Sequence, residues 1–221
     1  MKDVVRDFIE LVSISSSSKN ERLIADRIKK MFDSLGINYI EDNTGKKVNG
    51  NSGNLIGKLK GKAGIEPILF SAHMDRVENE DNIKPKIKDG KIISSGNTIL
   101  AADDVAGIVS ILHGIKMIKE EKKEHGDIEI VFTVCEELGV QGSKYLDYSN
   151  LRSKMGFVFD SSGRLGRIIN CAIGKSTVEV KIYGKSSHAG SEPEKGINAI
   201  MGASNFLADI EEGRINEITT Y

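Results

Sequence analysis

Two residues with the chemistry of a metal site stand at the end of one apolar run. His73 ends the run PILFSAH, and Asp75 follows it two residues later, so alternation places both side chains on one face. The carboxylate of Asp75 could take the proton of one ring nitrogen and leave the other nitrogen free for a cation. A buried histidine and aspartate with a purely structural role give the same pattern, so this motif alone does not decide.

Three further acidic groups stand at the borders of predicted elements. Asp103 and Asp104 precede a predicted helix, Glu136 and Glu137 follow the apolar run IEIVFTVC, and Asp160 ends MGFVFD. A helix cap, a solvated acidic turn and a strand-ending aspartate are the structural explanations. Strand ends carry the sites of α/β folds, so we expect the groups to meet. One histidine with several carboxylates suits zinc or a similar divalent ion, and a carboxylate could bridge two ions about 3.5 to 4 Å apart.

The composition excludes several other classes of function. The 221 residues carry a net charge of −1 from 31 basic and 32 acidic residues without a basic block, so we expect no nucleic-acid partner. No apolar run approaches the roughly 20 residues that span a bilayer, and the start MKDVVRDFIELV is unlike a signal peptide, which predicts a cytoplasmic protein without a membrane partner. The two cysteines are too few for a disulfide scaffold or a cysteine zinc site.

The order of predicted elements indicates an α/β fold. Helical spacing of apolar residues predicts helices at 4–12, 24–35 and 108–118, strands are predicted at 54–59, 67–73, 128–135 and 155–160, and Asp89-Gly90 predicts a hairpin turn. Alternating strands and helices are typical of a three-layer domain. After Gly174 the pattern changes to an alternating strand at 176–184 and a helix at about 198–211, with another strand expected to begin within 213–221. This predicts the start of a second, smaller domain.

Five motifs occur in one order along the chain and resemble those of a known family. They are HMD, NTILAADDVAG, VCEELGVQGS, FVFDSSG and GKSSHAGSEPEKGINAI. Together they resemble the M20 family of zinc peptidases, in particular its peptidase T-like aminotripeptidases, over nearly the whole chain. The resemblance implies a three-layer catalytic domain with a mixed, mainly parallel sheet at 1–173 that lacks its C-terminal segment. It also implies the truncated start of a ferredoxin-like α+β lid at 174–221.

The resemblance also implies two zinc ions. His73, Asp103 and Asp160 would hold the first, and Asp103 would bridge to the second, which Glu137 would also hold. The family supplies a further histidine for the second zinc from a C-terminal segment, so we expect that site to be incomplete in this chain. The chain is therefore expected to be truncated and poorly active.

Three residues receive catalytic roles from the same resemblance. Glu136 would be the general base that takes a proton from a zinc-bridging water, and Asp75 would orient the zinc-binding histidine. His188 would polarise the substrate carbonyl, often from the partner subunit of a dimer, so a homodimer through the lid is implied. Without the resemblance, His188 is an ordinary surface residue. The other histidines, His113 and His125, match no motif and are expected on the surface.

The function implied is that of a metal-dependent exopeptidase hydrolysing short peptides, like a tripeptide aminopeptidase. Two alternatives remain open at this point. One is an aminoacylase or deacetylase of the same family, which would prefer N-acylated substrates. The other is a catalytically silent, truncated metal-binding remnant.

Overall fold

The computed structural model describes residues 2–77, 82–171, 174, 176–210 and 213. The chain divides into two compact units, Met1–Ser162 and Gly163–Tyr221, each of which is described by itself. This boundary lies earlier in the chain than the predicted one between 173 and 174. The interpretation of the two parts as a catalytic domain and a lid stays a prediction.

A five-stranded sheet forms the centre of the first unit. Its strands, in spatial order, are β1 (Asn38–Glu41), β2 (Leu55–Leu59), β6 (Ile128–Thr133), β3 (Ile68–His73) and β7 (Gly156–Val158). The β6, β3 and β7 strands run parallel, whereas β1 pairs with β2, and β2 with β6, in antiparallel fashion. The predicted mixed sheet is confirmed, and its parallel part brings the carboxyl ends of three strands to one edge.

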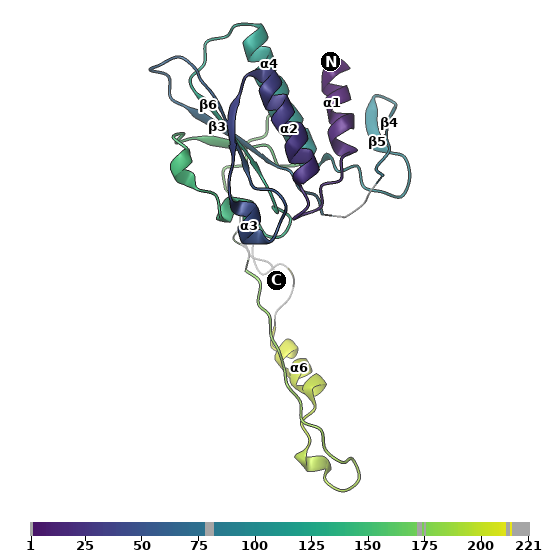
Figure 1. Cartoon of the computed structure of the whole chain (residues 1–221). Coiled ribbons are helices and arrows are strands. Elements are labelled where there is room, and N and C mark those ends of the chain that lie inside the picture. Colours follow the sequence, from purple (N-terminus) through teal and green to yellow (C-terminus); the bar gives the residue numbers. More distant parts are fainter. Residues whose placement is uncertain (1, 78–81, 172–173, 175, 211–212, 214–221) are drawn as a thin grey trace. The chain divides into compact units, whose positions relative to one another are not determined.

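Helices bury the sheet because their apolar residues recur on one side. The helices of this unit are α1 (Lys2–Val12), α2 (Arg22–Leu35), α3 (Thr44–Val48), α4 (Ala102–Glu120) and α5 (Gln141–Lys144), with a 3-10 helix at Tyr148–Asn150. The α1, α2 and α4 helices lie side by side (Figure 1). Phe32 of α2 and Ile108 of α4 are fully buried with Phe132 of β6 in the main core. A smaller cluster of Ile56, Val131 and Leu146 covers part of the sheet separately.

The predicted hairpin is confirmed. The β4 strand (Pro85–Lys88) pairs antiparallel with β5 (Lys91–Ser94). Asp89 has φ 50° and Gly90 has φ 73°, and two left-handed residues in succession are what a tight two-residue hairpin turn needs.

The surface prediction for His113 was wrong. The Nε2 atom of His113 lies 2.9 Å from a carboxylate oxygen of Asp7, and each side chain is only 12% exposed. The reason is that α1 packs against α4 at this point. His125 is half-buried, with Nδ1 facing the carbonyl of Gly126 at 2.6 Å.

The described residues of the second unit form one α-helix, α6 (Ala199–Ala208), and a 3-10 helix at Pro193–Lys195. Asn198 caps α6 by accepting two backbone N–H groups, which confirms the described part of the predicted helix. The predicted strand at 176–184 is wrong for its described residues, because no described segment pairs with it and only Lys185 forms an isolated bridge, to Ile197. The strand expected within 213–221 falls outside the described residues except for Gly213.

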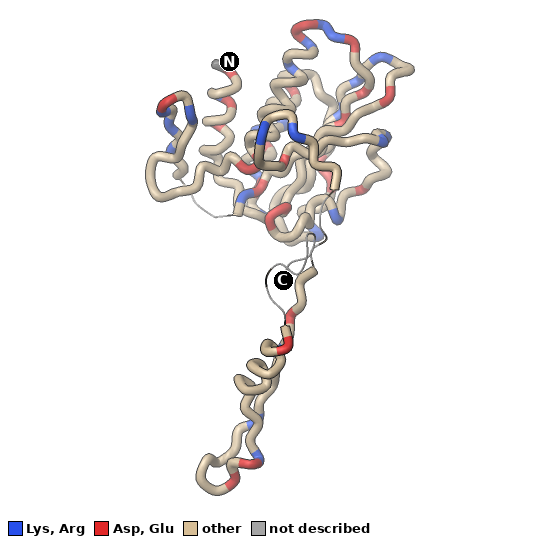
Figure 2. The backbone as a smooth tube through the Cα atoms, turned by 180° about the vertical axis from the view of Figure 1, so that it is seen from behind, with Lys and Arg blue, Asp and Glu red and all other residues tan. Residues whose placement is uncertain are grey.

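Charges of both signs are interspersed along the backbone of the first unit (Figure 2). None of the helices in the described part of the chain is both long and apolar enough to cross a bilayer.

Candidate metal centre

The parallel strands and one helix bring the predicted acidic groups of the first unit together. His73 is the last residue of β3, Glu136 and Glu137 follow β6, Asp160 follows β7, and Asp103 lies in the first turn of α4. Ligand atoms of His73, Asp103 and Glu137 all lie within 4.8 Å of one another, as do those of His73, Asp104 and Asp160. The structure therefore brings together the groups that were expected to meet, and it includes Asp104, to which the resemblance gave no role as a ligand.

The ring of His73 is held from one side and faces carboxylates on the other. The side chain is 2% exposed, and Nε2 lies 3.0 Å from Asp103 Oδ1 and 4.0 Å from Asp160 Oδ2. The Nδ1 atom lies 2.9 Å from the main-chain carbonyl of Asp75 and 3.5 Å from its Oδ1. The nearest partner of Nδ1 is thus the backbone oxygen of Asp75, and this contact turns Nε2 toward the other carboxylates.

The two adjacent aspartates have different surroundings. Asp104 is buried; its Oδ1 accepts the N–H of Gly107 at 3.0 Å and its Oδ2 accepts the N–H of His73 at 3.3 Å. Asp104 therefore caps α4 and ties it to the end of β3. The side chain of Asp103 is 71% exposed, and Nε2 of His73 is the hydrogen-bonding partner of its Oδ1. The capping explanation applies to Asp104, which leaves Asp103 available to a cation.

The carboxylate of Asp75 holds the segment that carries both glutamates. Its Oδ1 accepts the N–H of Glu136 at 2.8 Å, and its Oδ2 accepts the N–H of Glu137 at 3.2 Å. The hydroxyl of Ser18 donates to the same Oδ2 at 2.6 Å. Sequence reasoning missed Ser18, because a serine run before a helix indicates only a loop. The run SISSSSKN, which contains Ser18, predicted a loop here but gave no indication of its contact with Asp75.

The charges of the cluster favour a proton on His73. Burial alone lowers the pKa of His73, but its contact with Asp75 and the negative charges of Asp75, Asp104 and Asp160 outweigh burial and raise this pKa to about 10. The imidazole thus lies in a strongly negative field, which attracts a proton or a metal cation to Nε2.

The carboxylates of the cluster are destabilised in their ionised form. Burial raises the pKa of Asp104 to about 7 and also raises the pKa values of Glu136, Glu137 and Asp160; neighbouring carboxylates add to the effect and His73 opposes it. The ion pairs of the described residues place no lysine or arginine on these groups. An excess of negative charge with histidine and carboxylate donors is the environment that a divalent cation such as zinc neutralises.

His188 belongs to the second unit and is exposed. Its Nδ1 accepts the backbone N–H groups of Gly190 at 3.1 Å and Ser191 at 3.2 Å. Because Nδ1 accepts, a neutral ring carries its proton on Nε2 and can donate it in a hydrogen bond.

The chain is similar to known peptidases over most of its length. The sequence profile of peptidase family M28 matches residues 54–204. The chain belongs to peptidase family M28. It is 42% identical over 219 residues to the uncharacterized protein YqjE of Bacillus subtilis, covering 99% of this chain and 59% of that one.

Two solved structures share the fold of this M28 chain. Aminopeptidase PepT from Bacillus cereus is 40% identical with a TM-score of 0.84, covering 98% of this chain and 58% of that chain. A tripeptidase from Staphylococcus aureus is 34% identical with a TM-score of 0.84, and the match covers 99% of this chain and 59% of that chain. The resemblance to peptidase T-like enzymes is confirmed, although the matching profile carries the designation M28 where the sequence resemblance named M20. The chain spans about three fifths of the length of these relatives.

Proposed function

We propose that this chain supplies the metal centre and general base of a zinc exopeptidase that removes the N-terminal residue from short peptides. The observation that carries the proposal is the position of His73 at the carboxyl edge of the sheet, where it shares one group of donors with Asp103 and Glu137 and another with Asp104 and Asp160. The two similar structures, those of an aminopeptidase and a tripeptidase, support the class of substrate.

The donor set favours one distribution of ligands. His73, Asp103 and Asp160 would hold a first zinc, and Asp103 with Glu137 would hold a second. Asp104 is a poorer ligand although it lies close, because both of its oxygens already accept backbone N–H groups. The exposed carboxylate of Asp103 has room to bridge two cations.

Glu136 is the residue best placed to move protons. Its backbone N–H is fixed by Asp75, and burial raises the pKa of its side chain, which makes the carboxylate a better proton acceptor near neutral pH. Bound zinc would polarise the scissile carbonyl and acidify a water molecule. Glu136 would accept the proton of that water and pass it to the leaving amine. His188 would donate its Nε2–H to the carbonyl oxygen as negative charge develops there, in the same chain or in a partner subunit.

Three substrates separate this proposal from its alternatives. The purified protein is supplied with zinc and given a free tripeptide, the same tripeptide with an acetylated N-terminus, and an N-acetyl amino acid. The proposal expects release of the N-terminal residue from the free tripeptide alone. Turnover of the acetylated compounds instead would favour a deacylase. Zinc bound at close to two ions per chain without any turnover would favour a silent metal-binding protein.

A further inference from the structure

A buried carboxylate that has no role in the proposed chemistry lies behind the two glutamates. Glu21 is 0% exposed. Its Oε1 accepts the N–H of Cys135 at 3.0 Å and the N–H of Lys19 at 2.9 Å, and it lies 3.4 Å from the sulfur of Cys135. Its Oε2 is buried without a hydrogen-bond partner among the described residues. A buried, half-satisfied carboxylate is costly, so its presence needs a reason.

Helix capping is not that reason. Glu21 occupies the N-cap position of α2, but its side chain makes no capping hydrogen bond there. Only its main-chain carbonyl serves the helix, by accepting the N–H of Ala25. The carboxylate instead reaches a residue 114 positions away in the sequence, at the end of β6.

The segment that Glu21 reaches carries the proposed base and a proposed metal ligand. Three consecutive backbone N–H groups, those of Cys135, Glu136 and Glu137, are each accepted by a buried carboxylate. Glu21 accepts the first, and Asp75 accepts the other two. Cys135 has φ 50°, a left-handed conformation that a side chain disfavours, so the chain turns here only if something holds it. The direction in which the glutamates leave the sheet thus depends on both carboxylates.

We infer that Glu21 is a positioning residue for Glu136 and Glu137, which it controls through the N–H of Cys135. The inference rests on the proposed function where it concerns Glu136 as the base. It rests on the metal centre alone where it concerns Glu137 as a ligand. Charged acceptors make the stronger backbone hydrogen bonds, so a carboxylate at this point limits the movement of the turn.

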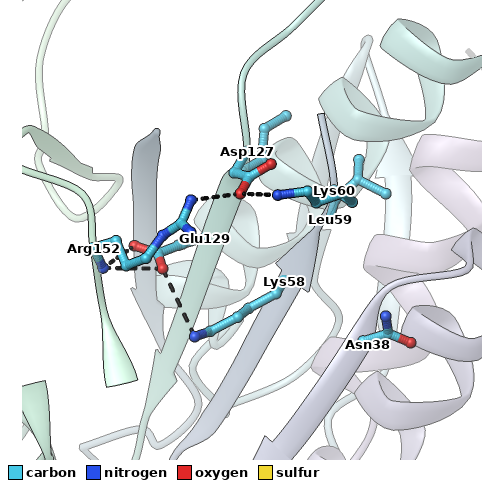
Figure 3. A pocket seen from close by; sticks show the side chains of 8 residues that line it. Asn38, Lys58, Leu59, Lys60, Asp127, Glu129 and Arg152 are labelled. Atoms are coloured by element: carbon cyan, nitrogen blue, oxygen red, sulfur yellow. Dashed lines mark hydrogen bonds and ion pairs between the residues drawn. The ribbon is translucent and has the colours of Figure 1, made fainter. Parts of the chain in front are cut away.

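Another carboxylate of the first unit provides a matched control. Glu129 lies in β6, and its side chain is 3% exposed. It accepts the backbone N–H group of Arg152 at 2.9 Å (Figure 3) and that of Ser153 at 2.9 Å. It therefore makes the same kind of bond as Glu21 near the amino end of the strand, away from the glutamates. Removing it disturbs the fold by the same means without touching the turn.

The experiment compares Glu21→Ala, Glu21→Gln and Glu129→Ala. The first readout needs neither metal nor substrate: labelling of the buried Cys135 thiol, with the exposed Cys171 as the internal reference. The others are the zinc dissociation constant, and kcat and KM separately. Glu21→Ala is expected to speed the labelling of Cys135. It should also weaken zinc binding and lower kcat by about 10- to 100-fold, with KM nearly unchanged.

The remaining variants distinguish positioning from simple destabilisation. Glu21→Gln keeps an oxygen acceptor for the N–H of Cys135. It is therefore expected to retain most of the zinc affinity and most of the kcat that Glu21→Ala loses. Glu129→Ala is expected to lower the melting temperature while leaving kcat and zinc affinity at wild-type values. If Glu21→Ala does not fold, Glu21→Asp takes its place, because the shorter side chain no longer reaches the N–H of Cys135.

Two results would overturn the inference. One is wild-type zinc affinity and kcat in a folded Glu21→Ala or Glu21→Asp protein. The other is an equal loss in Glu129→Ala. If the wild-type protein hydrolyses no peptide, the proposed function fails, while thiol labelling and zinc affinity still decide the role of Glu21.

Discussion

The two ends of β6 carry carboxylates in opposite situations. Near the amino end, Asp127 forms ion pairs with Lys60 and Arg152, and Glu129 faces Lys58 in the same pocket (Figure 3). The pKa of Asp127 is lowered, mainly by the hydrogen bond from the N–H of Gly61 and to a smaller extent by the hydrogen bond from Lys60.

Glu129 shows how a buried carboxylate can be kept ionised. Burial opposes its ionisation, but the hydroxyl and N–H of Ser153 and the N–H of Arg152 outweigh burial and lower its pKa. Beyond the carboxyl end, Glu136 and Glu137 have raised pKa values. Among the described residues, no lysine or arginine forms an ion pair with Glu136 or Glu137. Donors of the protein itself thus keep Asp127 and Glu129 ionised at the amino end, whereas Glu136 and Glu137 at the carboxyl end lie in a negative field that suits a divalent cation.

The largest effect is expected from the side chain of Glu136. Glutamine has nearly the same shape and leaves the backbone bond to Asp75 in place, but it cannot accept a proton. Glu136→Gln is therefore expected to lower kcat by about 10²- to 10⁴-fold. Zinc content should stay unchanged. Glu129→Gln, at the other end of the strand, should keep its kcat, and a Glu136→Gln protein within threefold of wild-type kcat would contradict the assignment.

Chelation tests whether a cation compensates the carboxylates at the carboxyl end. A ligand at 100 times its dissociation constant stabilises the folded state by about 2.7 kcal/mol. For a chain of this size we expect a chelator to lower the melting temperature by about 5 to 10 °C. His73→Ala should remove this dependence on the chelator, whereas His113→Ala, outside the cluster, should retain it. Equal shifts in the two variants would place the metal elsewhere.

Much of this arrangement could be predicted from the sequence. The runs PILFSAH and IEIVFTVC indicated buried strands, and the acidic residues that follow several strands indicated a site at one edge of the sheet. What the sequence could not separate was the pair Asp103 and Asp104, because their division into ligand and cap depends on which side chain the fold buries. Ser18 and Glu21 were also missed. Their partners, Asp75 and Cys135, lie 57 and 114 residues away, so no local pattern connects them.

The error at 176–184 has a different origin. Alternating apolar and polar residues indicate that a segment can pair as a strand, but pairing needs a neighbour whose register the sequence does not state. The single bridge between Lys185 and Ile197 is what the described residues of this unit provide. The surface expectation for His113 was wrong for a similar reason, because the contact with Asp7 exists only once α1 packs on α4.

The stability of the metal-free protein should depend on pH through the carboxyl end. Asp104 has a folded-state pKa of about 7 against an ordinary 3.8, so its contribution is present at acid pH and is lost as the pH rises through about 7. His73, raised from 6.5 to about 10, loses its contribution as the pH rises through about 10. Both groups therefore stabilise the folded state less as the pH rises. The melting temperature of the metal-free protein should fall by a few degrees between pH 5 and pH 9.

Zinc and one variant make this pH test specific. Excess zinc should flatten the profile, since the cation replaces the protons that the cluster binds. Asp104→Asn should remove the part of the decrease in melting temperature that occurs below neutral pH. A metal-free melting temperature that rises over this range would show that the carboxylates of the cluster are not crowded in the way that their pKa values indicate.

The smallest effect is expected at the amino end, for the ion pair of Lys58. Its Nζ lies 3.9 Å from Glu129 Oε1 and the side chain is 48% exposed, so the pair is worth less than about 1 kcal/mol. Lys58 also donates to the carbonyl of Asn150, which is a further exposed contact. The bonds from the N–H groups of Arg152 and Ser153 remain when Lys58 is replaced, and these stabilise the ionised carboxylate of Glu129.

Denaturant unfolding of Lys58→Met and Glu129→Ala measures which donors hold this end. Glu129→Ala leaves two backbone N–H groups without their acceptor and should cost about 1 to 3 kcal/mol, more than Lys58→Met. The reverse order would mean that lysine, rather than the backbone, holds the carboxylate. In that case, the two ends of β6 would differ only in whether lysine or arginine side chains lie beside the carboxylates. Backbone donors would then not distinguish a structural carboxylate from a metal ligand.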